Sequence, residues 1–74
     1  MEEFRFLNAS KDRTLPTFTR IRAHTRMDAI EEFAQRYDLR IRSVADETVS
    51  FRHDSRTVFF SVSGVDPFLR VLFG

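Results

Sequence analysis

Five arginines stand at alternating positions in three short segments of this chain, with apolar residues between or beside them. They are Arg20, Arg22, Arg40, Arg42 and Arg52. In an extended strand successive side chains point to opposite faces, so each segment puts its arginines on one face and its apolar side chains on the other. We expect no acid among these outward positions. Arginine carries a rigid fork of donors that matches carboxylate or phosphate, so the pattern predicts a surface for an anionic partner.

Two phenylalanines are expected on the same face as the arginines. Val58, Phe60 and Val62 form one apolar side of a segment, which forces Phe59 to the other side, and Phe18 falls there by the same count. An arginine-rich face with exposed rings has the composition of a binding surface. We therefore take Phe18 and Phe59, with the five arginines, as candidate partner-binding residues. The alternative is a solvated outer face whose arginines pair with nearby acids: Glu2, Glu3, Asp46 or Glu47.

One amphipathic helix is expected between residues 25 and 38. Thr25 is a suitable N-cap, and Asp28 stands three positions later, where it completes an imperfect capping box. Apolar side chains recur at spacings of three and four, which predicts that one face of the helix packs on a sheet. The members of this stripe are Met27, Ile30, Phe33, Ala34 and Tyr37.

Strands are expected on both sides of the helix. The apolar alternation and turn residues predict them at 4–7, 17–24, 39–44, 48–53 and 57–62. The first two form a hairpin with a long loop, and the last three form an antiparallel meander that ends at Gly64. The order is β-β-α-β-β-β, an α+β single domain of residues 1–74 in which one helix covers one face of an antiparallel sheet of about five strands. Residues 66–73 fit a sixth strand, a helical turn or a dimer contact.

Composition narrows the function classes. The 74 residues include nine phenylalanines and no cysteine. We therefore expect an aromatic core, and neither a disulfide scaffold nor a thiolate zinc site. Twelve basic and eleven acidic residues give a net charge of +1, so any electrostatic role depends on how the charges are distributed. The sequence has no signal-peptide pattern and no apolar stretch long enough to span a membrane. We expect a cytoplasmic monomer or homodimer with no membrane partner.

Catalysis is not expected. His24 and His53 could serve as the acid and base of a small metal-independent nuclease, with arginine holding phosphate. The strand period places them on opposite faces, however, so we assign no catalytic residue. No spacing of acids selects a metal site, and we assign no metal and no cofactor.

In its size, element organisation and lack of catalytic residues, the chain resembles the small phage-encoded inhibitor proteins, including anti-CRISPR proteins. The resemblance extends over the whole chain as a type and is carried by no residue motif. It implies a large host protein or nucleoprotein complex with an acidic surface as the partner. The alternative is a nucleic-acid-binding accessory protein that uses the same arginine and aromatic face, although the RNP1, GXXG and helix-turn-helix motifs are missing.

Overall fold

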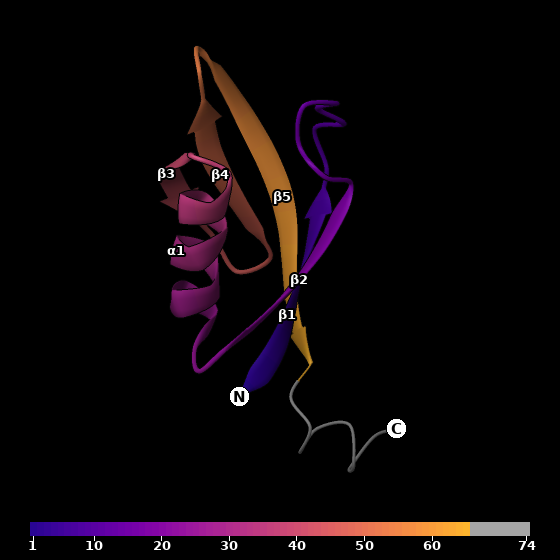
Figure 1. Cartoon of the computed structure of the whole chain (residues 1–74), viewed down its shortest axis with the longest axis vertical. Helices are drawn as coiled ribbons and strands as arrows, with labels where there is room; N and C mark the ends of the chain where they lie inside the picture. The colour runs from indigo at the N-terminus through magenta and orange to yellow at the C-terminus, as the bar shows by residue number, and fades with distance from the viewer. Residues whose placement is uncertain (66–74) are drawn as a thin grey trace.

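The computed structural model describes residues 1–65, and the expectations for residues 66–73 lie outside that range. Residues 1–65 form one helix and five strands (Figure 1). The elements are β1 (Glu2–Asn8), β2 (Phe18–Ala23), α1 (Arg26–Arg36), β3 (Arg40–Val44), β4 (Thr48–His53) and β5 (Arg56–Val65). The predicted α+β fold, with the order β-β-α-β-β-β, is confirmed.

All five strands form one antiparallel sheet with the order β2-β1-β5-β4-β3. The N-terminal hairpin and the C-terminal meander are joined by the pairing of β1 with β5, which places Phe6 opposite Val62. The prediction that the meander ends at Gly64 is wrong by one residue, because β5 continues to Val65. The strand expected at 57–62 is therefore longer, and its residues 63–65 pair with residues 3–5 of β1. Figure 1 shows β5 as a long, curved strand at the centre of the sheet.

The core lies between α1 and one face of the sheet, and Phe33 is at its centre. The Phe33 ring stacks on Phe6 with 4.5 Å between centroids, and it lies 4.8 Å from the rings of Phe60 and Tyr37. Phe51 closes the cluster at 5.4 Å. Phe33, Phe6, Phe51 and Phe60 are each fully buried. The expected aromatic core is therefore confirmed, and it is built from both halves of the sheet.

Local contacts define both ends of the helix. The amide of Asp28 donates to Thr25 Oγ1 at 3.0 Å, so Thr25 is the N-cap that the sequence predicted. After the helix, Asp38 adopts a positive φ of 54°, and the Leu39 amide donates to the Ala34 carbonyl at 2.8 Å. One member of the predicted stripe is wrong: Met27, in the first turn at the margin of the stripe, is exposed.

Gly64 is a position where a side chain does not fit. It lies opposite Phe4 on β1, and a Cβ at Gly64 would stand 2.8 Å from Phe4 Cε1. Because the Phe4 ring is buried, the ring or the strand would have to shift. We expect Gly64→Ala to lower the free energy of unfolding by about 1–3 kcal/mol in urea denaturation. Ser63→Ala, on the exposed face, should change it by less than about 0.5 kcal/mol. Equal losses in the two variants would contradict the close approach.

Candidate functional site

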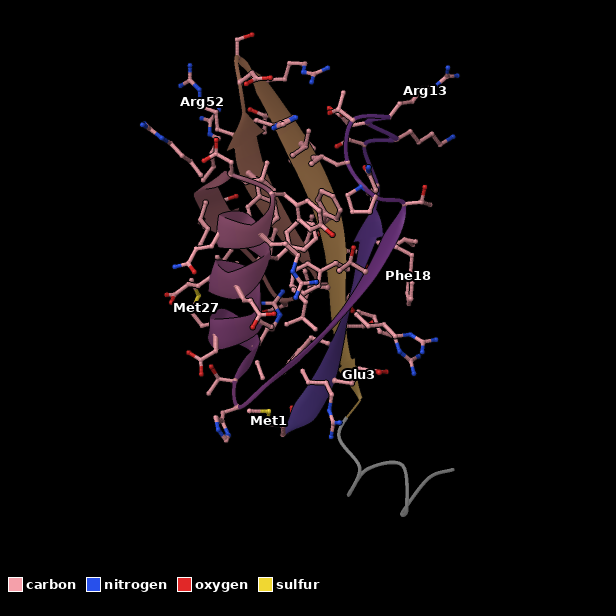
Figure 2. All side chains as sticks on the ribbon, in the orientation of Figure 1. Met1, Glu3, Arg13, Phe18, Met27 and Arg52 are labelled. Atoms are coloured by element: carbon pink, nitrogen blue, oxygen red, sulfur yellow. The ribbon has the colours of Figure 1, made fainter. Side chains whose placement is uncertain are left out.

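The sheet has an open face on the side away from α1, and the strand pairing shows which side chains share it. Residues directly opposite one another in neighbouring antiparallel strands point to the same face. Phe18 is opposite Leu7, and Phe59 is opposite Ser50. Figure 2 shows Phe18 pointing away from the helix. The seven predicted residues are all exposed, and their registers and contacts place them on this face.

One basic cluster, which we call the β2 cluster, consists of Arg5, Arg20 and Arg22. Arg20 lies opposite Arg5, and its guanidinium carbon is 5.5 Å from the centroid of the Phe18 ring, a cation–π contact. Glu3 stands opposite Arg22 and pairs with Arg5 at 3.3 Å. The expectation of an acid-free face is therefore wrong at this end. The acid comes from β1, which lies between β2 and β5 and contributes its own outward positions.

A second basic cluster, the β4 cluster, consists of Arg40, Arg42 and Arg52. Arg40 and Arg52 stand directly opposite each other, an arrangement of like charges that costs stability. Asp38 and Asp54 line the same shallow pocket, yet neither forms an ion pair with these arginines within 4.0 Å among residues 1–65. The Arg52 Nε instead donates to the backbone carbonyl of Asp54 at 3.3 Å.

Arg42 lies on the open face at a β-bulge. The register shifts between Ile41 and Ser43, so one residue of β3 has no direct partner in β4. Arg42 Nη1 donates to Thr57 Oγ1 at 2.9 Å, across β4. The hydroxyls of Ser43 and Ser50 lie 2.5 Å apart beside it. The predicted alternation gives Arg42 its outward position without a bulge. The bulge instead shifts the pairing of the residues after it, so that Ser43 lies opposite Ser50 and Val44 lies opposite Val49.

An apolar row lies between the two basic clusters. It consists of Leu7, Phe18 and Phe59, which expose 50%, 46% and 48% of their surface. Leu7 was not among the predicted site residues. The signal for it was present, because Phe4 and Phe6 point into the core and the residue after Phe6 must point outward.

Along the strand direction, the open face therefore consists of the β2 cluster, the apolar row and the β4 cluster, in that order. Ser63 lies opposite Arg5 and Thr57 lies opposite Arg52, six positions apart on β5. At about 3.3 Å per residue, the two basic clusters are about 20 Å apart along the strand direction, and they also lie on different strands of the sheet. The sheet brings the five arginines to one face, and the apolar row lies between the two basic clusters. Among residues 1–65 the ion pairs are Glu3–Arg5, Glu32–Arg36 and Asp12–Arg56, so none involves the five predicted arginines.

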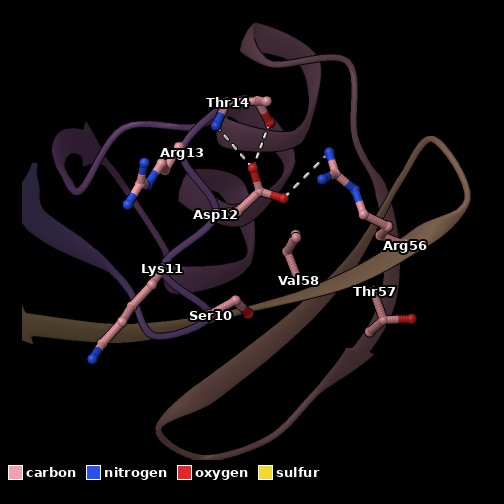
Figure 3. A pocket seen from close by; sticks show the side chains of 8 residues that line it. All are labelled: Ser10, Lys11, Asp12, Arg13, Thr14, Arg56, Thr57 and Val58. Carbon is pink, nitrogen blue, oxygen red and sulfur yellow. Dashed lines mark hydrogen bonds and ion pairs between the residues drawn. The ribbon is translucent and has the colours of Figure 1, made fainter.

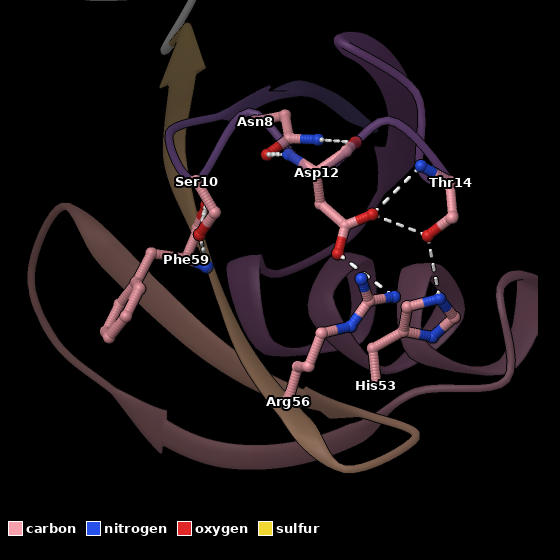
Figure 4. A network of polar contacts seen from close by, with 7 residues as sticks. All are labelled: Asn8, Ser10, Asp12, Thr14, His53, Arg56 and Phe59. Carbon is pink, nitrogen blue, oxygen red and sulfur yellow. Dashed lines mark hydrogen bonds and ion pairs between the residues drawn. The ribbon is translucent and has the colours of Figure 1, made fainter.

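A polar network at the other end of β1 holds the loop between β1 and β2 against the β4–β5 hairpin (Figure 4). The amide and hydroxyl of Thr14 donate to Asp12 Oδ1 at 2.9 and 2.5 Å, and Arg56 Nη2 is 3.4 Å from Asp12 Oδ2. Thr14 Oγ1 also lies 3.0 Å from His53 Nε2. Because the one hydroxyl proton goes to Asp12, the His53 Nε2–H must donate to Thr14. Because His53 Nε2 carries a proton in this contact, it cannot accept one from the Thr14 hydroxyl as a general base would. The network instead holds the loop in place.

The neighbouring pocket is lined by the same loop and the start of β5 (Figure 3). Lys11 and Arg13 belong to its rim, and their side chains point away from the Asp12 carboxylate. The cation closest to the carboxylate, Arg56, is engaged in the ion pair with Asp12. The pocket therefore lacks converging cations that could hold an anion.

Asp12 makes the fold sensitive to acid. The hydroxyl and amide of Thr14 hold the pKa of Asp12 below its usual range, and the charges of Arg56 and His53 act in the same direction, against desolvation. A lowered folded-state pKa stabilises the fold above the unfolded value of about 3.9, and this stabilisation is lost as the pH falls through the folded-state value.

We expect Asp12→Asn to reduce the acid dependence of stability. Between about pH 6 and about pH 3, the thermal midpoint of Asp12→Asn should fall less than that of the unchanged protein, because the neutral amide has no proton to gain. Asp46→Asn, in the exposed turn between β3 and β4, serves as the control and should follow the unchanged protein. If the thermal midpoint of Asp12→Asn fell as much as that of the unchanged protein, the Asp12 network would not link pH to folding.

The two histidines lie apart. His53 is opposite Arg56 and, by strand parity, shares the helix-covered face with Phe51, whereas His24 is exposed after the end of β2. In the part of the chain described, no three histidine or acidic side chains gather where they could hold a metal ion. No helix within residues 1–65 is both long and apolar enough to cross a membrane.

Comparison of the chain with protein-family models, with curated proteins and with solved structures finds no match.

Proposed function

We propose that this protein is a small non-enzymatic binding protein, which docks its open sheet face on an acidic surface of a larger protein or nucleoprotein complex. The observation that supports this proposal is the apolar row of Leu7, Phe18 and Phe59 with a basic cluster on either side. Protein interfaces combine an apolar centre with arginine and aromatic residues, and their charged positions lie toward the rim.

The spacing of the cations favours a protein over a polyanion. Nucleic acid presents phosphates in an unbroken series, and proteins that follow it place cations along the whole track. Here the two basic clusters are about 20 Å apart along the strand direction, with apolar and hydroxyl side chains between them. The net charge of +1 also limits long-range attraction to a polyanion. A folded partner with two acidic patches around an apolar centre matches the face better.

The proposal includes a mode of action. A small domain without a catalytic site acts on a large complex by covering the surface that another molecule would use. Inhibition of a host defence machine by a phage-encoded protein is one instance, and the resemblance in size and organisation supports it. In that setting the protein acts in the cytoplasm of the host cell.

Binding to nucleic acid is the second candidate, and the exposed rings favour it. Phe18 and Phe59 are both half exposed on the sheet, and single-stranded nucleic acid is bound by stacking bases on such rings beside cations. This candidate uses the same residues as the first, so salt dependence and target identity must separate them.

A capture experiment tests the proposed function. The tagged protein is used as bait in lysate of its native host, beside Arg22→Glu/Arg42→Glu and a matched control, Lys11→Glu/Arg13→Glu, whose positions are exposed in the loop before β2. We expect the unchanged bait and the control to retain one protein partner after nuclease treatment, and the open-face variant to lose it. A partner retained equally by all three baits would contradict the proposal.

We further expect weak or absent electrophoretic shifts with generic DNA and RNA near physiological salt. A nucleic-acid binder would instead lose log affinity by about 0.7 to 0.9 per phosphate contact for each unit of log salt. Submicromolar, salt-sensitive binding to nucleic acid alone, lost in Arg22→Glu/Arg42→Glu, would replace the first candidate with the second.

A further inference from the structure

The outer edge of β2 has unpaired backbone groups, and the ladder with β1 identifies them. The Asn8 amide donates to the carbonyl of Thr17, its direct partner, at 2.9 Å. Bonded and non-bonded pairs alternate along antiparallel strands, so Thr19 and Ile21 direct their backbone groups toward β1. The residues at the alternate positions, 18, 20 and 22, direct their backbone groups away from the sheet.

These outward amides and carbonyls belong to Phe18, Arg20 and Arg22. Among the strands of residues 1–65, β2 lies at the edge of the sheet and pairs with β1 alone. Within residues 1–65 no turn, cap or side-chain bond reaches the backbone of these three residues. Their side chains lie on the open face, so the free backbone and two predicted arginines of the docking surface occupy one strand.

The opposite edge of the sheet is protected. β3 has five residues, and the bulge at Arg42 interrupts its pairing. Short strands and bulges are the devices that keep a sheet edge from pairing with another chain. β2 has six residues in regular register and no bulge, and its arginines oppose the addition of a basic strand only. The sheet therefore has one edge suited to accept a further strand.

The charges on β2 indicate what that strand should carry. Arg20 already stands opposite Arg5, and pairing of β2 with β2 of a second copy would add arginines beside Arg20 and Arg22. Like charges at opposed positions are destabilising, whereas opposite charges there stabilise. An acidic strand would remove the repulsion, and a second copy would increase it.

We propose that β2 binds an extended acidic segment of the partner as a sixth strand of the sheet. The backbone of Phe18, Arg20 and Arg22 bonds to the segment, and carboxylates at alternate positions of the segment lie over the two arginines. This inference rests on the proposed function, since it names the part of the acidic partner that occupies one end of the open face.

A synthetic peptide tests the inference without the native partner. The probe has about eight residues that alternate glutamate with threonine, with blocked ends. We expect the amide exchange of Phe18, Arg20 and Arg22, followed by NMR, to slow by about tenfold or more on binding. Thr19 and Ile21, which already bond to β1, should change little. Two control peptides carry lysine in place of glutamate, or N-methyl groups on alternate backbone amides, and both should bind at least about tenfold more weakly.

A pair of variants separates backbone pairing from charge. Arg20→Pro and Arg20→Ala both remove the guanidinium, but only proline removes the outward N–H, which β1 does not use. With folding of both confirmed by circular dichroism, Arg20→Pro should bind the glutamate peptide at least about threefold more weakly than Arg20→Ala.

The contrary results are distinct from failure of the proposed function. Four results would each overturn the sixth strand. The glutamate peptide could fail to bind, or the N-methylated peptide could bind equally well. The amides of Phe18, Arg20 and Arg22 could remain unprotected, or sedimentation could show that the protein dimerises through β2. The proposed function would still stand if capture of the native partner depended on Arg22 and Arg42. If capture did not depend on them, the proposed function would fail whatever the peptide did.

Discussion

Phe33→Ala is expected to lower the free energy of unfolding by about 3–5 kcal/mol. The Phe33 ring touches Phe6, Phe51 and Phe60 on three different strands, and the Tyr37 ring on its own helix. Its removal leaves a cavity that a helix and a sheet in fixed positions cannot close. Small domains have a total stability near the lower end of about 5–15 kcal/mol, so much of the variant should be unfolded without denaturant. Urea denaturation followed by circular dichroism measures the loss.

Phe59→Ala is the matched control for Phe33→Ala. It removes the same ring from the open face, where Phe59 is 48% exposed. We expect a loss of less than about 1 kcal/mol, as for surface positions away from special features. A Phe33→Ala variant with the stability of Phe59→Ala would mean that α1 does not pack on the sheet through this ring.

Arg20→Glu/Arg40→Glu is expected to weaken binding to the captured partner by about 100-fold or more. Each substitution puts a negative charge in one basic cluster, so the acidic patches of the partner meet repulsion at both ends of the open face. Titration calorimetry on the purified pair measures the change, and Lys11→Glu/Arg13→Glu is the control with the same change in net charge.

The same double variant should keep its stability within about 1 kcal/mol. Arg20 lies opposite Arg5 and Arg40 lies opposite Arg52, so each substitution replaces a like-charged pair with an oppositely charged one. If the variant unfolded, these arginines would have a structural role and the docking surface would be wrong.

Local patterns in the sequence were enough to predict the elements and their faces. The alternation around Ile21 separates core from surface within one strand, and the Thr25 cap with the Phe33 stripe defines the helix, because both signals depend on neighbours within about one turn. Phe59 was placed outward by the same reasoning. These predictions need no knowledge of which strands pair.

The arrangement of the site could not be predicted, because it depends on pairing between distant segments. Alternation around Phe4 and Phe6 gives Glu3 and Leu7 their outward face, but only the pairing of β1 with β2 and β5 places them between the arginine-bearing strands. The bulge at Arg42 follows from the register of β3 on β4, which alternation alone does not specify. The contact of Thr14 with His53 joins residues 39 positions apart, and the sequence offers only the local Asp12-x-Thr14 turn pattern as a signal.

Chemical footprinting of arginine tests the open face most directly. The free protein and its complex with the captured partner are treated with an arginine-specific dicarbonyl reagent, and the modified positions are quantified by mass spectrometry. We predict that Arg20, Arg22, Arg40 and Arg52 become protected in the complex, while Arg13, in the exposed loop, and Arg36, on the helix, react as before. Protection of Arg13 or Arg36 with continued reaction of the open-face arginines would contradict the proposed docking surface.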